Sequence, residues 1–355
     1  MSKLRFGLST LALSVVTGSA SWTALADGTV TLNGQIDNFI GSMRYNGATP
    51  SQLMMGQSGM STSWYGFDGQ EDLGDGMKAT FALEAFFQSN NGEAGRGTWD
   101  TFFGRNANIG LSGDFGAFTF GRALAPQSLP DFIFNPFGDS FTFSPLVLLS
   151  FIPYSNWTNS VVGDSGWSNE IVYSPPKVDG LTTNFHYQFG GVAGKNGVAN
   201  MGANAMYFSG PVGLTAYYQQ VKVNNPSGIA GDLQTFPGGM NVNKQDAWMV
   251  GGSYDLKKIK LYATSGKTTD DIGIMDKTET LGASIPWGSG KFMAGWGETQ
   301  RSGSLFGADK SHSITSVGYD YNLSKRVDLY MIYMNDSVTN ETSGNSYAAG
   351  MRLAF

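Results

Sequence analysis

The last ten residues of the chain, SYAAGMRLAF (346–355), alternate in polarity. One row is apolar and has an aromatic residue at both ends; its members are Tyr347, Ala349, Met351, Leu353 and Phe355. The residues between them are small or polar. Because successive side chains of a β-strand point to opposite faces of the sheet, this pattern predicts a final strand with one apolar face and one wet face.

The same period of two recurs along the chain. In LTTNFHYQF (181–189) the odd positions are mostly aromatic or aliphatic, and the even positions are Thr, Asn, His and Gln. TSVGYDYNL (315–323) and MKATFALEAFF (77–87) follow the same rule. The 49 glycines and an aromatic content of 13% also favour sheet and turn over helix. We therefore expect an all-β protein.

The connectors between these stretches are alternately short and long. The short ones suit tight hairpins and comprise residues 72–76, 113–116, 177–180, 209–212, 256–258, 288–290 and 323–325. The long ones hold polar and irregular sequence and comprise residues 46–62, 89–98, 125–168, 190–198, 224–244, 270–277, 302–311 and 338–345. Seven short and eight long connectors join sixteen strands.

This alternation of connector length distinguishes between two all-β architectures. A soluble β-sandwich gives no reason for loop lengths to alternate strictly. A transmembrane barrel has short turns at one end, long loops at the other and an even number of antiparallel strands. We therefore predict a sixteen-stranded antiparallel transmembrane β-barrel, with a soluble all-β protein as the alternative. In the barrel the last strand pairs with residues 28–37, because lipid requires every strand edge to be satisfied.

The first 26 residues have the features of a secretory signal peptide. Lys3 and Arg5 precede an apolar stretch, residues 8–16, that is too short to span a bilayer, and small residues follow as far as Ala26. The single folded domain is therefore expected to be residues 27–355. Without the signal peptide the formal net charge changes from -6 to -8, which argues against a nucleic-acid partner. The chain contains no Cys, so disulfide and thiolate chemistry are excluded.

Three ordered motifs resemble the general porins of beta-proteobacteria: GFDGQEDLGDGMKA (66–79), FGRNANIGLSGDFG (103–116) and FGR (120–122). The resemblance implies a trimeric channel in the outer membrane of a Gram-negative bacterium, with a third long loop folded into the barrel. It also implies contact with outer-membrane lipid and lipopolysaccharide, and with the barrel assembly machinery. Phe355 resembles the terminal aromatic assembly signal of such barrels; the alternative is an ordinary last residue of a strand.

The third long loop corresponds to residues 125–168, the longest connector. Its central sequence, DFIFNPFGDSFTFSPLVLLSFIPYSNW (131–157), is too aromatic for a disordered segment. A loop of this length is usually functional. We predict that it folds inward and constricts the channel, with a trimer-contact loop or a surface loop as the alternative.

Strand parity gives a set of pore-lining candidates. The wall candidates are Gln35, Asp37, Trp64, Asp68, Glu84 and Glu170, and the constriction loop adds Asp131 and Asp139. Each wall candidate is alternatively an ordinary solvated residue away from the narrowest point. Arg122 shares the parity of outward-facing Phe120, so either a bulge at Gly121 turns it inward or it lies elsewhere. Arg105 lies on an outward row and is expected to face a neighbouring subunit.

The resemblance also suggests where ion selectivity departs from the family pattern. Related porins often carry cationic wall residues at the positions that are Trp64, Asp68 and Val172 in this chain. Acid then predominates over base on the wet face, which predicts passive diffusion of ions and small hydrophilic solutes with a weak preference for cations. The aromatic residues Trp64 and 134–157 leave open a channel specialised for a solute that carries an aromatic or apolar group.

No catalytic, metal or cofactor site is predicted. The only histidines, His186 and His312, lack an acidic neighbour at a useful spacing. Neither an H-x-x-x-H motif nor a phosphate-binding glycine loop between a strand and a helix is present. A different class of function remains as the alternative, namely a closed barrel that serves as an adhesin or an enzyme.

Overall fold

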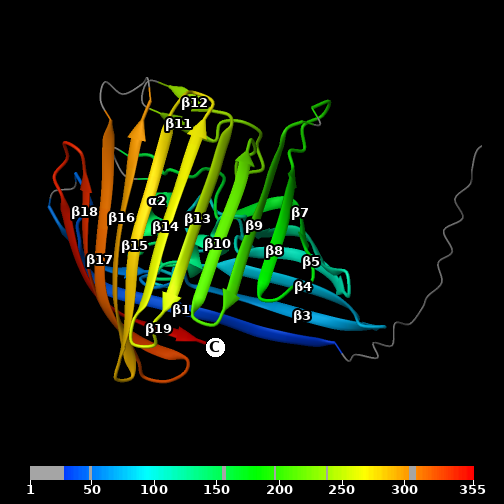
Figure 1. The fold of residues 1–355 in the computed structure, drawn as a ribbon, viewed down its shortest axis with the longest axis horizontal. Coiled ribbons are helices and arrows are strands. Elements are labelled where there is room, and N and C mark those ends of the chain that lie inside the picture. The colour runs from blue at the N-terminus through cyan, green and yellow to red at the C-terminus, as the bar shows by residue number, and fades with distance from the viewer. Residues whose placement is uncertain (1–27, 48–49, 154–156, 196, 237–238, 304–308) are drawn as a thin grey trace, which may run out of the picture.

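The computed structural model describes residues 28–47, 50–153, 157–195, 197–236, 239–303 and 309–355. The predicted signal peptide, residues 1–26, lies outside them. The described chain forms a closed antiparallel barrel, in which the last strand pairs with the first (Figure 1). The strands that precede the third long loop and those near the C-terminus therefore belong to one continuous wall.

The wall contains sixteen strands, as predicted. The hydrogen-bonded sheet has 17 strands, but β2 (Gln52–Gln57) and β3 (Trp64–Gly74) both pair with β1 and are two pieces of one wall strand. The others are β1 (Thr29–Met43), β4 (Met77–Phe86), β5 (Asn106–Gly113), β6 (Gly116–Leu124), β7 (Gly166–Ser174), β8 (Leu181–Phe189), β9 (Ala199–Ser209), β10 (Val212–Val221), β13 (Gln245–Asp255), β14 (Lys260–Asp270), β15 (Met275–Trp287), β16 (Gly290–Ser302), β17 (Lys310–Asn322), β18 (Val327–Val338) and β19 (Gly344–Ala354).

The connectors differ from the sequence prediction at five places. Residues 52–57, predicted to lie in the long connector 46–62, form the strand β2. Residues 271–274 and 339–343 form short turns rather than long loops, because the strand alternation continues closer to each turn than the polar residues suggested. Residues 224–244 contain a small hairpin of β11 (Gln234–Phe236) and β12 (Met240–Val242). The third long loop ends at residue 165, since 166–168 already belong to β7.

The outer face of the barrel is apolar and exposed. The terminal row behaves as its alternation predicts, with Tyr347, Met351 and Phe355 exposed while Ser346 is fully buried. The backbone of Phe355 exchanges two hydrogen bonds with Gly34 of β1, at 3.1 and 3.0 Å, which completes the closure of the barrel. No helix among the described residues is long and apolar enough to cross a membrane.

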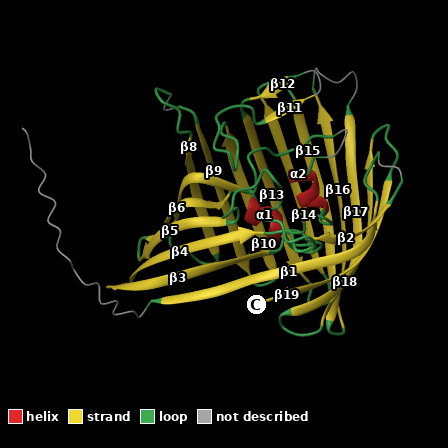
Figure 2. Ribbon diagram, turned by 180° about the vertical axis from the view of Figure 1, so that it is seen from behind, coloured by secondary structure: helices red, strands yellow, loops and turns green. Residues whose placement is uncertain are grey.

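The third loop, residues 125–165 and called L3 below, lies inside the barrel (Figure 2). It carries two short helices, α1 (Ser128–Ile133) and α2 (Pro145–Phe151). α2 contacts β15, β16 and β17, and α1 contacts β10. The interior of the barrel is therefore divided into a side that L3 covers and a side that it leaves free.

Candidate functional site

L3 packs against one side of the inner wall through a hydrophobic core. Ser144 caps the N-terminus of α2: its hydroxyl accepts a hydrogen bond from the backbone N–H of Val147, and Pro145 fits the first turn. The core joins L3 to β1 and to β16–β19; its buried members are Phe39, Met43, Met60, Phe137, Phe143, Leu148, Leu149, Met293, Ile314, Tyr330, Ile332, Met334 and Ala348. Burial of this much apolar surface holds L3 firmly on that side.

Small residues on β16 allow α2 to approach the wall. A Cβ atom at Gly297 would lie 2.8 Å from Leu149 Cδ1, and one at Gly295 would lie 3.3 Å from both Phe137 and Pro145. A larger residue at Gly297 therefore displaces the Leu149 side chain and presses on α2 at Pro145. The glycines of β16 set the position of L3 across the barrel.

Residues 58–63, between β2 and β3, provide a second anchor for L3. Ser140 and Thr142 donate side-chain hydrogen bonds to the carbonyls of Gly59 and Ser58, at 2.5 and 2.7 Å. The Ser61 hydroxyl donates to Asp139 at 2.6 Å. The loop is thus fixed from two directions, by the β16 side and by this segment.

Asp37 stabilises residues 58–63 by accepting hydrogen bonds from their backbone. It is fully buried and accepts hydrogen bonds from the backbone N–H groups of Gly59, Met60 and Ser61, at 3.0, 2.8 and 2.9 Å. The hydroxyl of Tyr330 also donates to it. The structure therefore places this predicted pore-lining residue in a structural role, away from water.

The other side of the inner wall, from β3 to β8, carries polar side chains that remain partly exposed inside the barrel. These residues are Trp64, Asp68, Thr80, Asn106, Asn108, Thr119 and Asn184. L3 also carries partly exposed side chains, namely Phe132, Asp139, Phe141 and Phe151. Of the predicted pore-lining residues, Gln35, Trp64, Asp68 and Asp139 retain exposure in this region.

Glu84, a predicted pore-lining residue, is buried and forms an ion pair with Arg105 beside this wall. Arg105 Nη1 lies 2.5 Å from Glu84 Oε2, and its guanidinium stacks 4.1 Å over the Trp64 ring. The expectation that Arg105 faces a neighbouring subunit is wrong. It lies on a bend one residue before β5 begins, so the alternation of the strand does not determine where its side chain points.

Arg122 turns inward at a bulge. The β6–β7 register shifts between Gly121 and Ala123, and Gly121 adopts φ +131°, a conformation that favours glycine. The Arg122 side chain is 5% exposed and donates to the carbonyls of Gly104 and Gly166, at 2.7 and 2.9 Å. Of the two sequence alternatives, the structure shows the bulge.

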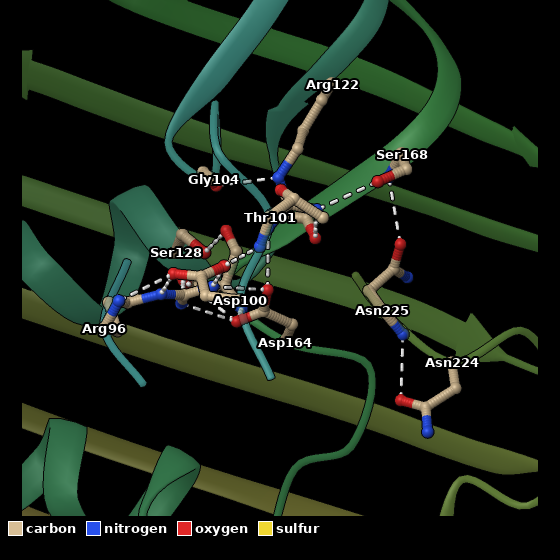
Figure 3. Close-up of polar contacts among 12 residues, drawn as sticks. Arg96, Asp100, Thr101, Gly104, Arg122, Ser128, Asp164, Ser168, Asn224 and Asn225 are labelled. Carbon is tan, nitrogen blue, oxygen red and sulfur yellow. Dashed lines mark hydrogen bonds and ion pairs between the residues drawn. The ribbon is translucent and has the colours of Figure 1, made fainter. Parts of the chain in front are cut away.

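Two arginines and two aspartates form a buried network beside Arg122 (Figure 3). Arg122 Nη2 bonds Asp164 Oδ2 at 2.8 Å, and Arg96 bonds both Asp164 and Asp100, at 2.8 and 2.7 Å. Arg96 belongs to residues 87–105, called L2 below. The network therefore ties L2, β6 and the end of L3 together, and its formal charges cancel.

The network perturbs the titration of its loop members. Burial alone would raise the pKa of Asp164, but the guanidiniums of Arg96 and Arg122 outweigh burial and lower the pKa to about 2. Burial opposes the charge of Arg96, but Asp164 and Asp100 more than compensate and raise its pKa above the usual value. Asp164 and Arg96 are consequently both charged at neutral pH.

Two other predicted residues are buried. Asp131 in α1 is fully buried, and this burial raises its pKa well above the usual range, so its carboxyl group favours the neutral form. Glu170 on β7 is 2% exposed, and its Oε2 lies 3.2 Å from His186 Nδ1. Neither carboxyl group is in contact with the water inside the barrel.

Sequence reasoning missed Arg96, Asp100 and Asp164. Their only signal was position, since Asp164 precedes the strand that pairs with β6, which carries Arg122, and Arg96 lies in the preceding long loop. The alternation of side chains along a strand says nothing about where loop side chains point, so the network could be found only from the folded structure. Among the described residues, no group of three or more His, Cys, Asp or Glu side chains is placed to hold a metal ion.

Comparison with known proteins gives a consistent set of similarities. The sequence profile of the family described as Gram-negative porin matches residues 10–341. Outer membrane porin protein 32 of Delftia acidovorans is 32% identical over 333 residues, which cover 91% of this chain and 87% of that protein. An outer membrane porin protein of Bordetella pertussis is 26% identical over 406 aligned positions, which cover 97% of this chain and 99% of that protein.

Among solved structures, the anion-selective porin from Comamonas acidovorans is similar to this chain. The two superpose with a TM-score of 0.73 and 25% sequence identity, over 93% of this chain and 100% of that one. That porin therefore resembles this chain in sequence as well as in fold.

Proposed function

The chain belongs to the Gram-negative porin family and is an outer-membrane channel, and we propose that ions and small hydrophilic solutes diffuse passively between L3 and the wall from β3 to β8. The observation that carries the proposal is the row of partly exposed polar side chains on that wall, together with the partly exposed side chains of L3. The other side of the barrel is filled by the hydrophobic core. Porins are channels and not enzymes, so the chain is not an enzyme.

The proposed ion preference is weakly cationic, and it rests on Asp68 and Asp139. Both are partly exposed, and both accept hydrogen bonds from neutral side chains, Asn33 and Ser61. Within the described part of the chain neither carboxylate forms an ion pair, whereas Glu84 is neutralised by Arg105. The interaction energy between a fixed charge and a nearby ion is several kcal/mol even at an effective dielectric of about 20. Two uncompensated carboxylates are therefore sufficient to favour cations.

The reversal potential across a planar bilayer under a KCl gradient tests this preference. We expect the unaltered protein to favour K⁺, and Asp68→Asn and Asp139→Asn each to shift the potential toward Cl⁻. Asp68→Arg should shift it further. Asp114→Asn, on an exposed turn, is the matched control and should have no effect. Anion preference in the unaltered protein, like that of the anion-selective porin from Comamonas acidovorans, would contradict the proposal.

We also propose that the functional unit is a homotrimer, as the family resemblance implies. Outward-facing small residues such as Ala107 and Ala349 are compatible with close packing against another copy under closed symmetry. Electrophoresis in mild detergent should show an oligomer that heating converts to a monomer. A monomer under all mild conditions would contradict the trimer.

The remaining partners follow from the same resemblance. We propose that the exposed apolar face contacts outer-membrane lipid and lipopolysaccharide, and that the barrel assembly machinery inserts the chain by recognising a terminal segment that includes Phe355. The exposed position of the Phe355 side chain, 41% accessible at the end of β19, is compatible with recognition of this kind. A binding measurement between the assembly machinery and a peptide of residues 346–355, with and without Phe355, tests it.

A further inference from the structure

A cavity of about 420 Å³ lies between L3, L2 and residues 57–62. Phe141 and Phe151 of L3 and Trp99 of L2 supply its aromatic surface, and Gln57 and Thr142 supply polar groups. The cavity is on the long-loop side of the barrel, since L2 and the end of L3 connect strands there. Its volume is in the range of natural small-molecule sites, which is about 300–1,000 Å³.

The aromatic surface of the cavity is preformed. Phe141 and Phe151 contact each other with ring centroids 5.5 Å apart, and both contact Phe132, at 5.8 and 6.3 Å. All three rings remain partly exposed, although the core beneath them buries Phe137 and Phe143 completely. Rings held in place by their neighbours lose little conformational freedom when a ligand ring packs on them.

Trp99 is positioned by the buried network rather than by the core. The Arg96 guanidinium lies 4.7 Å from the centre of the Trp99 ring and 4.9 Å from that of the Phe86 ring. Trp99 is nevertheless 58% exposed, so much of its surface is open to a ligand. An exposed indole ring that is held in place by its neighbours is typical of a binding surface.

The cavity carries no free charge among the described residues that line it. The N–H groups of Arg96 are engaged by Asp100, Asp164 and Ser165. The formal charges of the two arginines and two aspartates of the network cancel. The partly exposed Thr142 side chain lines the cavity and donates its hydroxyl proton to the Ser58 carbonyl, so its oxygen can accept a hydrogen bond from a ligand. These features suit a neutral ligand that has a ring and a hydroxyl group.

We propose that this cavity is a binding subsite for uncharged solutes that carry an aromatic ring and a hydrogen-bond donor. The inference rests on the proposed channel function and names the solute class that the channel retains on its way through. The ring packs against Phe141, Phe151 and Trp99, and the donor bonds the Thr142 hydroxyl oxygen. A solute without a ring passes without being held.

The test compares phenyl β-D-glucopyranoside with methyl β-D-glucopyranoside, two neutral glucosides that differ in the ring. In planar bilayers, the phenyl compound should reduce the current of the unaltered protein in a saturable way, and the methyl compound should not. Trp99→Ala and Phe151→Ala should each raise the half-blocking concentration by roughly tenfold, the effect of losing one well-packed ring contact. Phe102→Ala is the matched control, since Phe102 is 60% exposed on L2 but does not line the cavity.

Binding measured without conduction separates this inference from the channel proposal. Saturation-transfer NMR on the detergent-solubilised protein should give a phenyl signal that weakens in Trp99→Ala and Phe151→Ala and persists in Phe102→Ala. Equal signals in all four proteins, or equal block by the two glucosides, would overturn the subsite. A lack of conductance steps together with the expected NMR differences would leave the subsite standing and would contradict only the channel proposal.

Discussion

The replacement Asp164→Asn tests how L3 and L2 are held together. Asp164 bonds Arg96 through both of its oxygens, at 2.8 and 2.9 Å, and bonds Arg122 at 2.8 Å. Asparagine has nearly the same shape, so the replacement removes the charge and leaves the packing. It leaves two buried guanidiniums with Asp100 as their only carboxylate in the network.

Two independent routes give the size of the effect. The pKa of Asp164 falls from 3.8 to about 2 in the folded protein, which corresponds to roughly 2–3 kcal/mol of stability at neutral pH. Breaking a buried ion pair by removing one partner typically costs about 3–5 kcal/mol, since the remaining charge is left uncompensated. We therefore expect the free energy of local opening of L2 and the end of L3 to fall by roughly 2–5 kcal/mol.

The same residue predicts a pH dependence. Because the folded pKa of Asp164 is depressed, its contribution is present above the unfolded pKa of 3.8 and is lost as the pH falls toward about 2. The unaltered protein near pH 2 should therefore resemble Asp164→Asn at neutral pH in this region. The variant itself should show little further loss in that interval.

Hydrogen exchange monitored by mass spectrometry measures the local opening. Peptides from L2 and from residues 157–165 should exchange at least about 30-fold faster in Asp164→Asn, which is the lower bound of 2 kcal/mol expressed as a rate. Asp114→Asn, on an exposed turn, is the control and should leave these peptides unchanged. Unchanged exchange in Asp164→Asn would refute the role assigned to the network.

Three further changes have expected outcomes. Deleting Phe355, whose backbone pairs with Gly34, should lower the yield of assembled, heat-modifiable barrel more than the roughly 2–3 kcal/mol of one apolar contact explains; a normal yield would contradict this. Asp131→Asn should leave hydrogen exchange of L3 unchanged or slower at pH 7, because the Asp131 carboxyl group is fully buried and forms no ion pair within the described chain, which favours a neutral side chain; faster exchange would argue against it. Gly297→Leu should push Leu149 and α2 toward the open wall and lower the single-channel conductance; an unaltered conductance would mean that L3 does not border the path.

The barrel could be predicted from the sequence because the patterns that indicate it are local. The alternation of residues 181–189 and 346–355 and the alternation of loop lengths follow from strand geometry and from the difference between lipid and water. The inward position of the loop rested on the resemblance and on its aromatic content. The division of the second wall strand was not accessible: residues 46–62 were expected to form one long connector, whereas residues 52–57 form β2 and only residues 58–63 leave the wall before β3.

The site was harder to predict because burial depends on what L3 covers. Parity put Asp37 and Glu170 among the pore-lining candidates, but the packing of residues 58–63 and of neighbouring side chains buries both, which parity does not reveal. Arg105 was misplaced because it precedes the strand. The inward position of the Arg122 side chain depends on a single bulge at Gly121, which the sequence allowed without requiring it.

The position of the conducting path inside the barrel can be measured most directly with single cysteines. The chain contains no Cys, so one can be placed at Asn108 on the open wall and another at Ser316, which is fully buried on the β17 side. A charged thiosulfonate reagent is then added during current recording from each variant. We expect a stepwise change of conductance for Asn108→Cys and none for Ser316→Cys. Modification at Ser316→Cys with no response at Asn108→Cys would contradict a path between L3 and the wall from β3 to β8.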